Sequence, residues 1–502
     1  MMKTYKRILL VQALFIGLFF FCITPVSARE IIKITMDGAV DIAMGKSYRI
    51  KQLQMGIERN RFRLKARQAS LKSRVYMNLS APEYKAVSDY KWNSTLKKDE
   101  IIRENTKLWE MDLAIRQPVV LLGRPTNGYL SLNNKLYKYI QQDGYRDVNF
   151  YNRYYVEFEQ PFFLPNELKN DIEDAELDLE MREHEYVRDR VWLIERVADD
   201  YYDMFEYSYY NTIYLNQIEN LNKISDIAGE LALRDTTRAM DKIQIQVELA
   251  NVRETLLKNQ SALRRQEAET KQRLRLSAED SVYVEPIFAF KPINVDAEHA
   301  IEHAFSLRPT LRMLNINKRK NELDLSDAKG WDAFHVNLEM TYGLEKQDER
   351  HQAMWSEYDN SYSASLNAYV PIWDWGRRKA RIEAERIGVL QSDLRIEENQ
   401  NEIRSEIIIS VQNLLEYQIR TRNMMENKKM VQEITDTSIE QYRNGMVTVQ
   451  DLLQIITRQT ETEINYLEAY QGYRRSLLDL MMNTYYDYEN DISLIEKFRQ
   501  EG

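Results

Sequence analysis

The chain has 502 residues, and its 69 lysines and arginines against 78 aspartates and glutamates give a net charge of −9. An acidic chain is a poor partner for nucleic acid, because phosphates bind basic surfaces. Only 15 glycines and 10 prolines are present, well below the average share of about 12%, which predicts long uninterrupted helices.

The N-terminus has the pattern of a cleavable export signal. Basic residues at Lys3, Lys6 and Arg7 precede an apolar run from residue 8 to residue 23, and small residues end at Ala28. We expect cleavage after Ala28, so that residues 1–28 form a signal peptide. The leader carries three basic residues and no acidic one, so its removal changes the net charge from −9 to −12.

The single cysteine, Cys22, lies within this leader, and the bulky residues before it are unlike a lipoprotein processing site. The exported protein is therefore expected to lack disulfides and to depend on packing or oligomerisation for stability. After residue 28 no apolar stretch approaches the roughly 20 residues of a membrane helix. Any membrane contact must come from strands.

The rest of the chain consists of two copies of one unit. At an offset of 210 residues, Tyr155–Phe163 is matched by Ser365–Trp373 and Asp241 is matched by Asp451. A second register, at an offset of 261 residues, aligns the segments that precede the strands. The difference between the two offsets leaves about 51 extra residues in the first copy.

Each copy is predicted to run from a helix through strands into a long helical hairpin. We expect the first repeat over residues 29–276, with an extra strand hairpin at about 80–150 and a helical hairpin over 166–276. The second repeat covers 277–483, with a linker and helix at 277–332, strands at 334–370 and a helical hairpin at 374–483. Residues 484–502 form a C-terminal equatorial segment.

The strand segments alternate between apolar and polar side chains. In the second repeat the apolar positions run from Phe334 to Leu344 and from Tyr362 to Val370. The first repeat shows a weaker alternation, including Met111, Leu113 and Ile115 in the surplus segment. Strands of this kind fit a membrane barrel whose apolar face meets lipid, and they also fit a soluble sandwich. By the same parity, three polar residues are expected to face the barrel interior: Glu157, Glu159 and Asn367.

The segment from Asp374 to about Tyr442 contains no proline and predicts a helix of nearly 70 residues, roughly 100 Å long at about 1.5 Å per residue. Within it, apolar residues recur at spacings of 7, 4, 4 and 3. A narrow seam of this period is typical of coiled-coil packing. Its members are Ile396, Ile403, Ile407, Val411 and Leu414.

Three motifs together resemble the TolC family of outer-membrane efflux proteins. They are the junction Pro-Ile-Trp-Asp-Trp-Gly-Arg-Arg at 371–378, Tyr442-x-x-Gly445, and Asp451-Leu-Leu. The resemblance implies a mainly α fold with a membrane β-barrel part, in which three protomers share a twelve-stranded barrel and a long periplasmic tunnel of coiled-coil helices. It also implies the outer membrane of a Gram-negative bacterium, a homotrimer, and a periplasmic adaptor and inner-membrane pump as partners.

The same resemblance supplies candidate positions for a gate. Tyr442, Gly445 and Asp451 match the tip of the second helical hairpin, where the family closes its tunnel with a ring of acidic side chains. Gln454 stands where family members often carry a second acid, which argues against a doubled acidic gate. Asp451 also fits a simple structural role, because an acidic residue stabilises the N-terminus of a helix.

Aromatic residues, together with prolines and a glycine that interrupt regular structure, cluster where each strand meets its long helix. We interpret them as an aromatic girdle at the inner membrane interface, with packing of the junction itself as the alternative. The set is Pro161, Phe162, Phe163, Pro371, Trp373, Trp375 and Gly376.

The sequence contains no catalytic constellation. His299 and His303 lie four residues apart on a predicted helix beside Glu298 and Glu302, but two histidines without further ligands are weak evidence for a metal site. We therefore predict neither cofactor nor metal. The predicted function is a passive exit duct for efflux or type I secretion, and the competing interpretation is a soluble periplasmic coiled-coil adaptor or scaffold.

Overall fold

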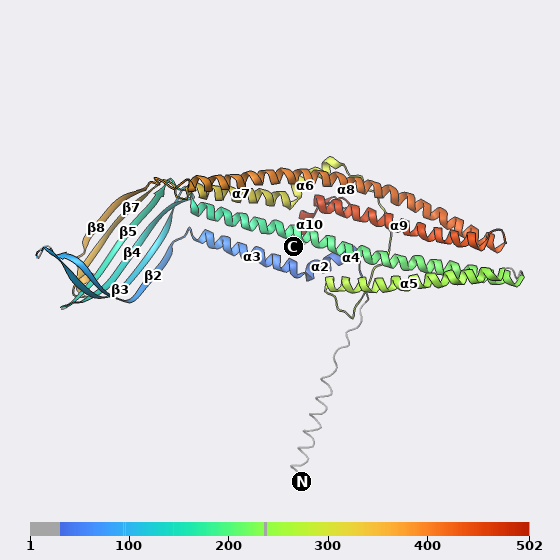
Figure 1. Cartoon of the computed structure of the whole chain (residues 1–502), viewed down its shortest axis with the longest axis horizontal. Coiled ribbons are helices and arrows are strands. Elements are labelled where there is room, and N and C mark those ends of the chain that lie inside the picture. Colours follow the sequence, from blue (N-terminus) through green and yellow to red (C-terminus); the bar gives the residue numbers. More distant parts are fainter. Residues whose placement is uncertain (1–30, 94, 96, 144, 235–237, 501–502) are drawn as a thin grey trace, which may run out of the picture. The chain divides into compact units, whose positions relative to one another are not determined.

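The computed structural model describes residues 31–93, 95, 97–143, 145–234 and 238–500 (Figure 1). The predicted signal peptide and its cleavage site after Ala28 lie outside these residues. The chain divides into two compact units. The strand unit comprises Gln52–Tyr186 and Pro309–Asn401, and the hairpin unit comprises residues up to Lys51, Val187–Arg308 and residues from Glu402 onward.

The strand unit is built around one antiparallel sheet whose strands follow the order β2-β3-β4-β5-β7-β8. Among the described residues, β5 and β7 are the only neighbouring strands that α-helices separate in sequence, so the sheet is a meander with one long insertion between these two strands. The strands are β2 (Arg74–Asn93), β3 (Lys98–Leu121), β4 (Arg124–Asp143), β5 (Tyr145–Phe162), β7 (His335–Asp348) and β8 (Asp359–Tyr369).

In the described part of the chain the sheet has six strands, whereas the family resemblance implies four from each protomer. The additional strands are β3 and β4, which lie inside the sheet between β2 and β5. They are joined at Leu122 and Gly123, whose φ angles of 51° and 76° are both positive. Two consecutive residues with positive φ give the turn twist that matches the twist of a hairpin.

Helices adjoin the sheet at the end where β2 starts and β8 finishes (Figure 1). They are α3 (Tyr48–Ala69), α7 (Pro309–Gly330) and the first parts of α4 (Glu167–Arg234) and α8 (Arg377–Arg443). α8 runs for 67 residues, as the absence of proline after Pro371 predicts, because proline removes a backbone hydrogen bond and clashes with the preceding turn.

The hairpin unit contains the remainder of α4 and α8 together with their returning helices, α5 (Ala239–Leu274) and α9 (Val449–Thr484). Around them lie α2 (Met36–Lys46), α6 (Ala297–Leu307) and a short parallel pair of β1 (Ile31–Lys33) with β6 (Ser281–Tyr283). Among the described residues, no helix combines the length and apolar character needed to cross a membrane.

The predicted seam of α8 forms the packed face of this helix. Ile403, Ile407 and Leu414 are buried, and Ile396 and Val411 are half-buried. Burial then continues at multiples of seven residues from Ile407, which is the coiled-coil period. The buried positions of this series are Ile407, Leu414, Thr421, Thr435 and Tyr442.

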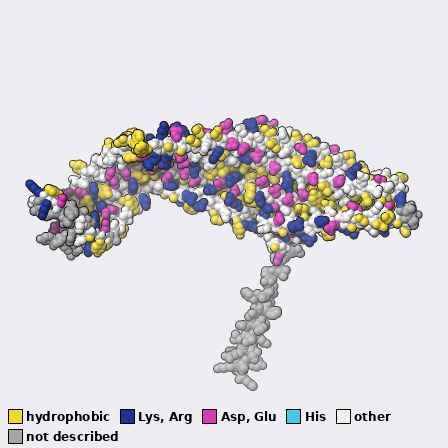
Figure 2. Space-filling view, viewed as in Figure 1, with side chains coloured by type: hydrophobic (Ala, Val, Ile, Leu, Met, Phe, Trp, Pro, Cys, Tyr) yellow, Lys and Arg dark blue, Asp and Glu magenta, His cyan; other side chains and the backbone are white. Residues whose placement is uncertain are grey.

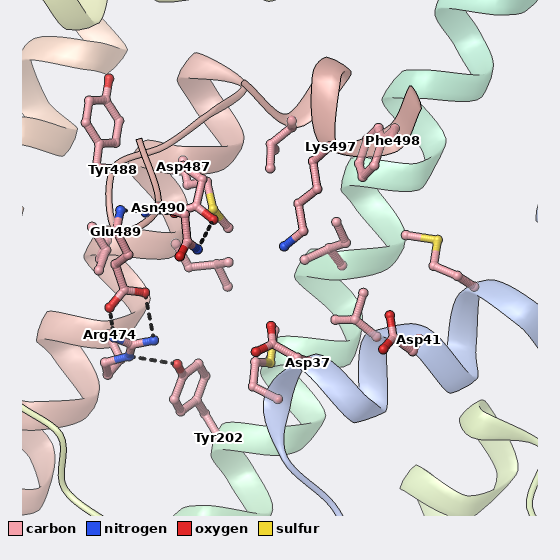
Figure 3. Close-up of a pocket in the computed structure, with 18 residues that line it drawn as sticks. Asp37, Asp41, Tyr202, Arg474, Asp487, Tyr488, Glu489, Asn490, Lys497 and Phe498 are labelled. Atoms are coloured by element: carbon pink, nitrogen blue, oxygen red, sulfur yellow. Dashed lines mark hydrogen bonds and ion pairs between the residues drawn. The ribbon is translucent and has the colours of Figure 1, made fainter. Parts of the chain in front are cut away.

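The C-terminal segment folds back on the helices of the hairpin unit through β9 (Tyr486–Asp487), β10 (Ile492–Ser493) and α10 (Leu494–Gln500). A cavity of about 340 Å³ lies between this segment and helices α2, α4 and α9 (Figure 3). Arg474 borders it and is fixed by Glu489 at 2.7 Å and by the Tyr202 hydroxyl at 3.1 Å. The segment is thus anchored by an ion pair as well as by apolar packing.

Candidate functional site

The first candidate region is the turn between α8 and α9. The N–H of Met446 donates to the carbonyl of Gln441 at 2.9 Å, and the N–H of Gly445 donates to the carbonyl of Tyr442 at 3.0 Å. These two bonds make a Schellman motif, which requires a left-handed residue just beyond the helix. Gly445 is this left-handed residue, with a φ of 74°, and glycine adopts such a value without steric strain because it has no Cβ.

The returning helix α9 begins with a reciprocal cap. The N–H of Asp451 donates to Thr448 Oγ1 at 3.2 Å, while the Thr448 hydroxyl donates to Asp451 Oδ2 at 2.7 Å. Asp451 therefore stabilises the helix start, as the structural alternative for this residue predicts. Its side chain is nevertheless exposed in the protomer, as is that of Gln454 one turn later.

Tyr442 connects the two helical hairpins at this end. Its side chain is fully buried among residues of all four helices, including Ile224, Ile245 and Leu452. The hydroxyl donates to Asp241 Oδ2, on α5, at 3.1 Å. Burial first, and the Asp241 carboxylate second, raise the pKa of Tyr442. The hydroxyl therefore stays protonated and remains a donor to the carboxylate.

Asp241 is the residue that sequence reasoning did not assign to the site. Asp241 and Asp451 occupy equivalent positions in the two repeats, 210 residues apart, but the two side chains have different contacts. Asp451 caps its own helix, whereas Asp241 accepts a hydrogen bond from the other hairpin. Arg238 lies close by, because a Cβ at Gly445 would stand 3.4 Å from its guanidinium. The hairpins are thus joined by polar contacts as well as by apolar packing.

The second candidate region is the polar face of the sheet. Glu157 accepts a hydrogen bond from Asn133 at 3.3 Å, and Glu159 pairs with Arg116 at 3.3 Å. Asn367 donates to Ser365 on its own strand at 3.3 Å. These side chains lie on the face opposite to the exposed apolar side chains of the same strands.

Ion pairs link neighbouring strands on this polar face. Lys135 on β4 forms an ion pair with Glu110 on β3. Arg116 lies over the Tyr129 ring at 3.8 Å, in addition to its contact with Glu159. The face is therefore hydrophilic and carries ion pairs between its strands, as expected of the wet side of a membrane strand.

The junctions between strands and long helices expose their aromatic side chains. Trp375 is 89% exposed, and its ring lies 5.5 Å from that of Trp373 in an edge-to-face arrangement. Phe163 contacts Phe334 with ring centroids 5.7 Å apart. Pro161 and Phe162 remain within β5, opposite Asn337 and Val336 of β7.

The second junction also starts α8. Trp375 and Gly376 have φ angles of 56° and 80°, and they turn the chain beyond Pro371 into the helix. The Asp374 carboxylate accepts hydrogen bonds from the N–H groups of Gly376 and Arg378 at 2.9 and 2.8 Å. These backbone donors, that of Arg378 foremost, hold the pKa of Asp374 below its usual value, so the cap stays ionised.

The two neighbouring histidines of α6 have separate surroundings. His299 contacts Glu302 at 3.3 Å on the surface, whereas His303 stacks on Tyr486 with ring centroids 4.1 Å apart. Within the described part of the chain, no group of three or more His, Cys, Asp or Glu side chains is placed to hold a metal ion.

The comparisons with known proteins identify a family signature in the second repeat. Residues 301–482 match the family model described as "Outer membrane efflux protein". This segment contains the strands β7 and β8, helix α8, and α9 except for its last two residues. No curated protein sequence matches the chain.

Solved channel structures share the fold over almost their whole length. The outer-membrane channel OprN has a TM-score of 0.64 at 14% identity, covering 89% of each chain. VceC from Vibrio cholerae has a TM-score of 0.62 at 11% identity, covering 89% of this chain and 95% of its own. The CmeC channel of Campylobacter jejuni has a TM-score of 0.61 at 12% identity, covering 95% and 93%.

The predicted resemblance and fold class are thereby confirmed. The matched structures are outer-membrane channels, and the family model names outer-membrane efflux, in accord with the predicted localisation. At these identities the structural likeness shows the fold, while the assembly, cargo and gate belong to the proposals below.

Proposed function

Because residues 301–482 carry a domain of the outer membrane efflux protein family, we propose that three copies of this protein form a passive exit duct through the outer membrane. An inner-membrane pump, reached through a periplasmic adaptor, supplies the drive. The cargo is small toxic compounds in an efflux system or a polypeptide in type I secretion. The chain performs no chemistry on it.

The observation that carries this proposal is the exposed apolar face of the sheet. β5, β7 and β8 present side chains such as Val156, Tyr342 and Leu366 to the outside, and these are 42%, 61% and 68% exposed. A soluble domain buries such a face against a second layer. A lipid-facing strand leaves it open and keeps the polar side chains on the other face. The exposed apolar face therefore favours a membrane channel over a soluble adaptor.

The exposed side of α8 supports the trimer. Besides its buried seam, this helix has a second apolar stripe on another face, with spacings of 7, 4, 11 and 4 residues. An unpartnered stripe of this period requires a neighbouring helix, and additional copies of the chain provide it. We call it the exposed seam: Ile408, Leu415, Ile419, Met430 and Ile434.

The aromatic junctions support the placement of the sheet in the membrane. Figure 2 shows an apolar patch where the strands meet the helices, with basic side chains beside it. Ile372, Trp373 and Trp375 are strongly exposed there, and Arg377 and Arg381 follow on α8. Aromatic side chains favour the boundary between lipid and water, and basic groups favour the adjacent headgroups. We therefore propose that this patch lies at the periplasmic surface of the outer membrane.

The function is tested by recording single-channel currents after adding the purified protein to a planar lipid bilayer. A duct gives discrete conductance steps from a trimeric, detergent-dependent protein. A soluble adaptor stays monodisperse without detergent and gives no current, and that result would exclude the duct.

We further propose that the turn between α8 and α9, with Asp451, forms a gate of the duct, and this predicts an effect of Asp451→Ala on cations. Three symmetry-related carboxylates near the axis attract cations, so the substitution is expected to reduce both cation selectivity and block by a multivalent cation. Glu461→Ala removes an exposed acid elsewhere on α9 and should leave both unchanged. Equal block in the wild type and Asp451→Ala would leave Asp451 with its capping role alone.

A further inference from the structure

We infer that the membrane part of this protein is an 18-stranded barrel, to which each of three copies contributes six strands. The inference rests on the proposed trimer and concerns what the trimer encloses. The alternative is a twelve-stranded barrel with the β3–β4 hairpin outside the membrane, and three features of the sheet argue against it.

The first feature is an apolar row that crosses every strand of the sheet. The residues of this row are direct partners from strand to strand, and each one is a large apolar or aromatic side chain exposed on the same face. A hairpin outside the membrane has no reason to continue a lipid-facing row through its own strands. The row consists of Val75, Ile115, Leu132, Val156, Tyr342 and Tyr362.

The second feature is the polar face of the same strands. Arg116 on β3 reaches across β4 to Glu159 on β5. On the same side, the rings of Tyr137 on β4 and Tyr151 on β5 are stacked with centroids 4.6 Å apart. Both faces of β3 and β4 therefore continue those of β5, so these strands have the same inside and outside as the rest of the wall.

The third feature is the pair of free edges. β2 leaves the helical end of the unit after α3, and β8 returns to that end before α8. Because the number of strands is even, the two edge strands run in opposite directions, so β8 of one copy can pair antiparallel with β2 of the next. Unpaired edges are excluded in lipid, since their backbone groups have no water to bind. We therefore expect the two edge strands of each copy to pair with the edge strands of the two other copies.

The size of the barrel follows from its strand number. With strands about 4.8 Å apart and tilted by about 40°, 18 strands give a radius of about 18 Å at the backbone, against about 12 Å for twelve strands. Barrels of 16–18 strands leave an aqueous channel. The membrane segment would then be too wide to select cargo, which leaves selection to the helical end and the pump.

The placement of β3 and β4 is tested with single cysteines labelled by a small fluorophore in a Cys22→Ser background, in bilayers containing brominated lipids. Leu132→Cys and Leu113→Cys probe the outward positions of the two strands, and Asn133→Cys is the matched inward control. Val156→Cys probes β5, which both arrangements keep in the membrane. We expect loss of fluorescence at Leu132 and Leu113 equal to that at Val156, and none at Asn133.

The Val156 probe separates failure of the inference from failure of the proposed function. If Val156 is quenched and Leu132 and Leu113 are not, the chain is a membrane channel and the hairpin lies outside, which overturns the inference. If Val156 is not quenched either, the sheet does not meet lipid and the duct itself is wrong.

Cross-linking tests the closure independently. Asn78→Cys is combined in turn with Ser361→Cys, Ser363→Cys and Ser365→Cys, which places thiols on the polar sides of β2 and β8. Oxidation is expected to give covalent dimers and trimers for at least one pair. Asn78→Cys with Glu157→Cys is the opposing test, because a direct contact of β2 with β5 would form a bond within one chain. Such an intrachain bond would overturn the inference.

Discussion

Leu415→Glu together with Ile419→Glu is expected to convert the proposed trimer into monomers. Both side chains lie on the exposed seam of α8 and are 60% and 51% exposed in the single copy. Burying a leucine or isoleucine contributes about 1.5–3 kcal/mol, and the trimer repeats each contact three times. An unpaired carboxylate at the same place adds a desolvation cost. Light scattering in detergent, coupled to gel filtration, measures the change in mass.

The matched control adds the same two carboxylates outside the exposed seam. Asn413 and Arg420 are exposed on the same turns of α8, so Asn413→Glu with Arg420→Glu should leave the trimer intact. Circular dichroism establishes that both double variants retain their helices. A helical Leu415→Glu, Ile419→Glu protein that still elutes as a trimer would show that copies associate through another surface.

The long helices could be predicted from sequence because their determinants are local. A run without proline sets the length of α8, and the spacing of Ile403, Ile407 and Leu414 sets its buried face. The exposed seam was harder to recognise, because within one copy its leucines and isoleucines have no partner. Periodicity shows that a face is apolar, but it does not state what covers that face.

The strands illustrate a different limit. Alternation around Leu113 and Leu132 was readable and indicated an additional hairpin in residues 80–150. Whether this hairpin widens the sheet depends on its partners, and the pairing of Leu132 with Val156 joins it to the strand that follows. Each strand carries the same two-residue period, so the period cannot select a neighbour. The strand count of the family was consequently a poor guide here.

The hydrogen bond between the two hairpin turns was the hardest feature to predict, because it joins residues far apart in the sequence. Tyr442 and Asp241 are separated by 201 residues, and neither residue type is unusual for its position. Gly445, by contrast, was predictable because a helix reversal needs a positive φ. The residue that a local backbone conformation requires can be predicted from sequence, whereas a hydrogen bond between two hairpins depends on how the hairpins pack.

Tyr442→Phe is expected to raise the conductance of the resting channel several-fold. The hydroxyl holds α8 to Asp241 on α5 at 3.1 Å. In the proposed gate at this end of the duct, this hydrogen bond restrains the α8–α9 hairpin against α4–α5. A hydrogen bond to a charged group contributes about 1.5–3 kcal/mol. Because the buried ring is retained, the substitution removes this contact with little effect on the core. Planar-bilayer recording measures the resting current.

Tyr473→Phe is the matched control for this effect. Tyr473 is also fully buried, and its hydroxyl donates to the carbonyl of Lys291 at 2.6 Å, away from the turn. Tyr473→Phe removes the same hydroxyl group from a buried tyrosine. This variant should keep the resting conductance of the wild type. Asp241→Asn should raise the conductance in the same direction, and combining it with Tyr442→Phe should add little, because both changes weaken one contact. Fully additive effects would mean that the two residues restrain the hairpins separately, and a resting current unchanged by Tyr442→Phe would mean that this hydrogen bond is not part of the closure.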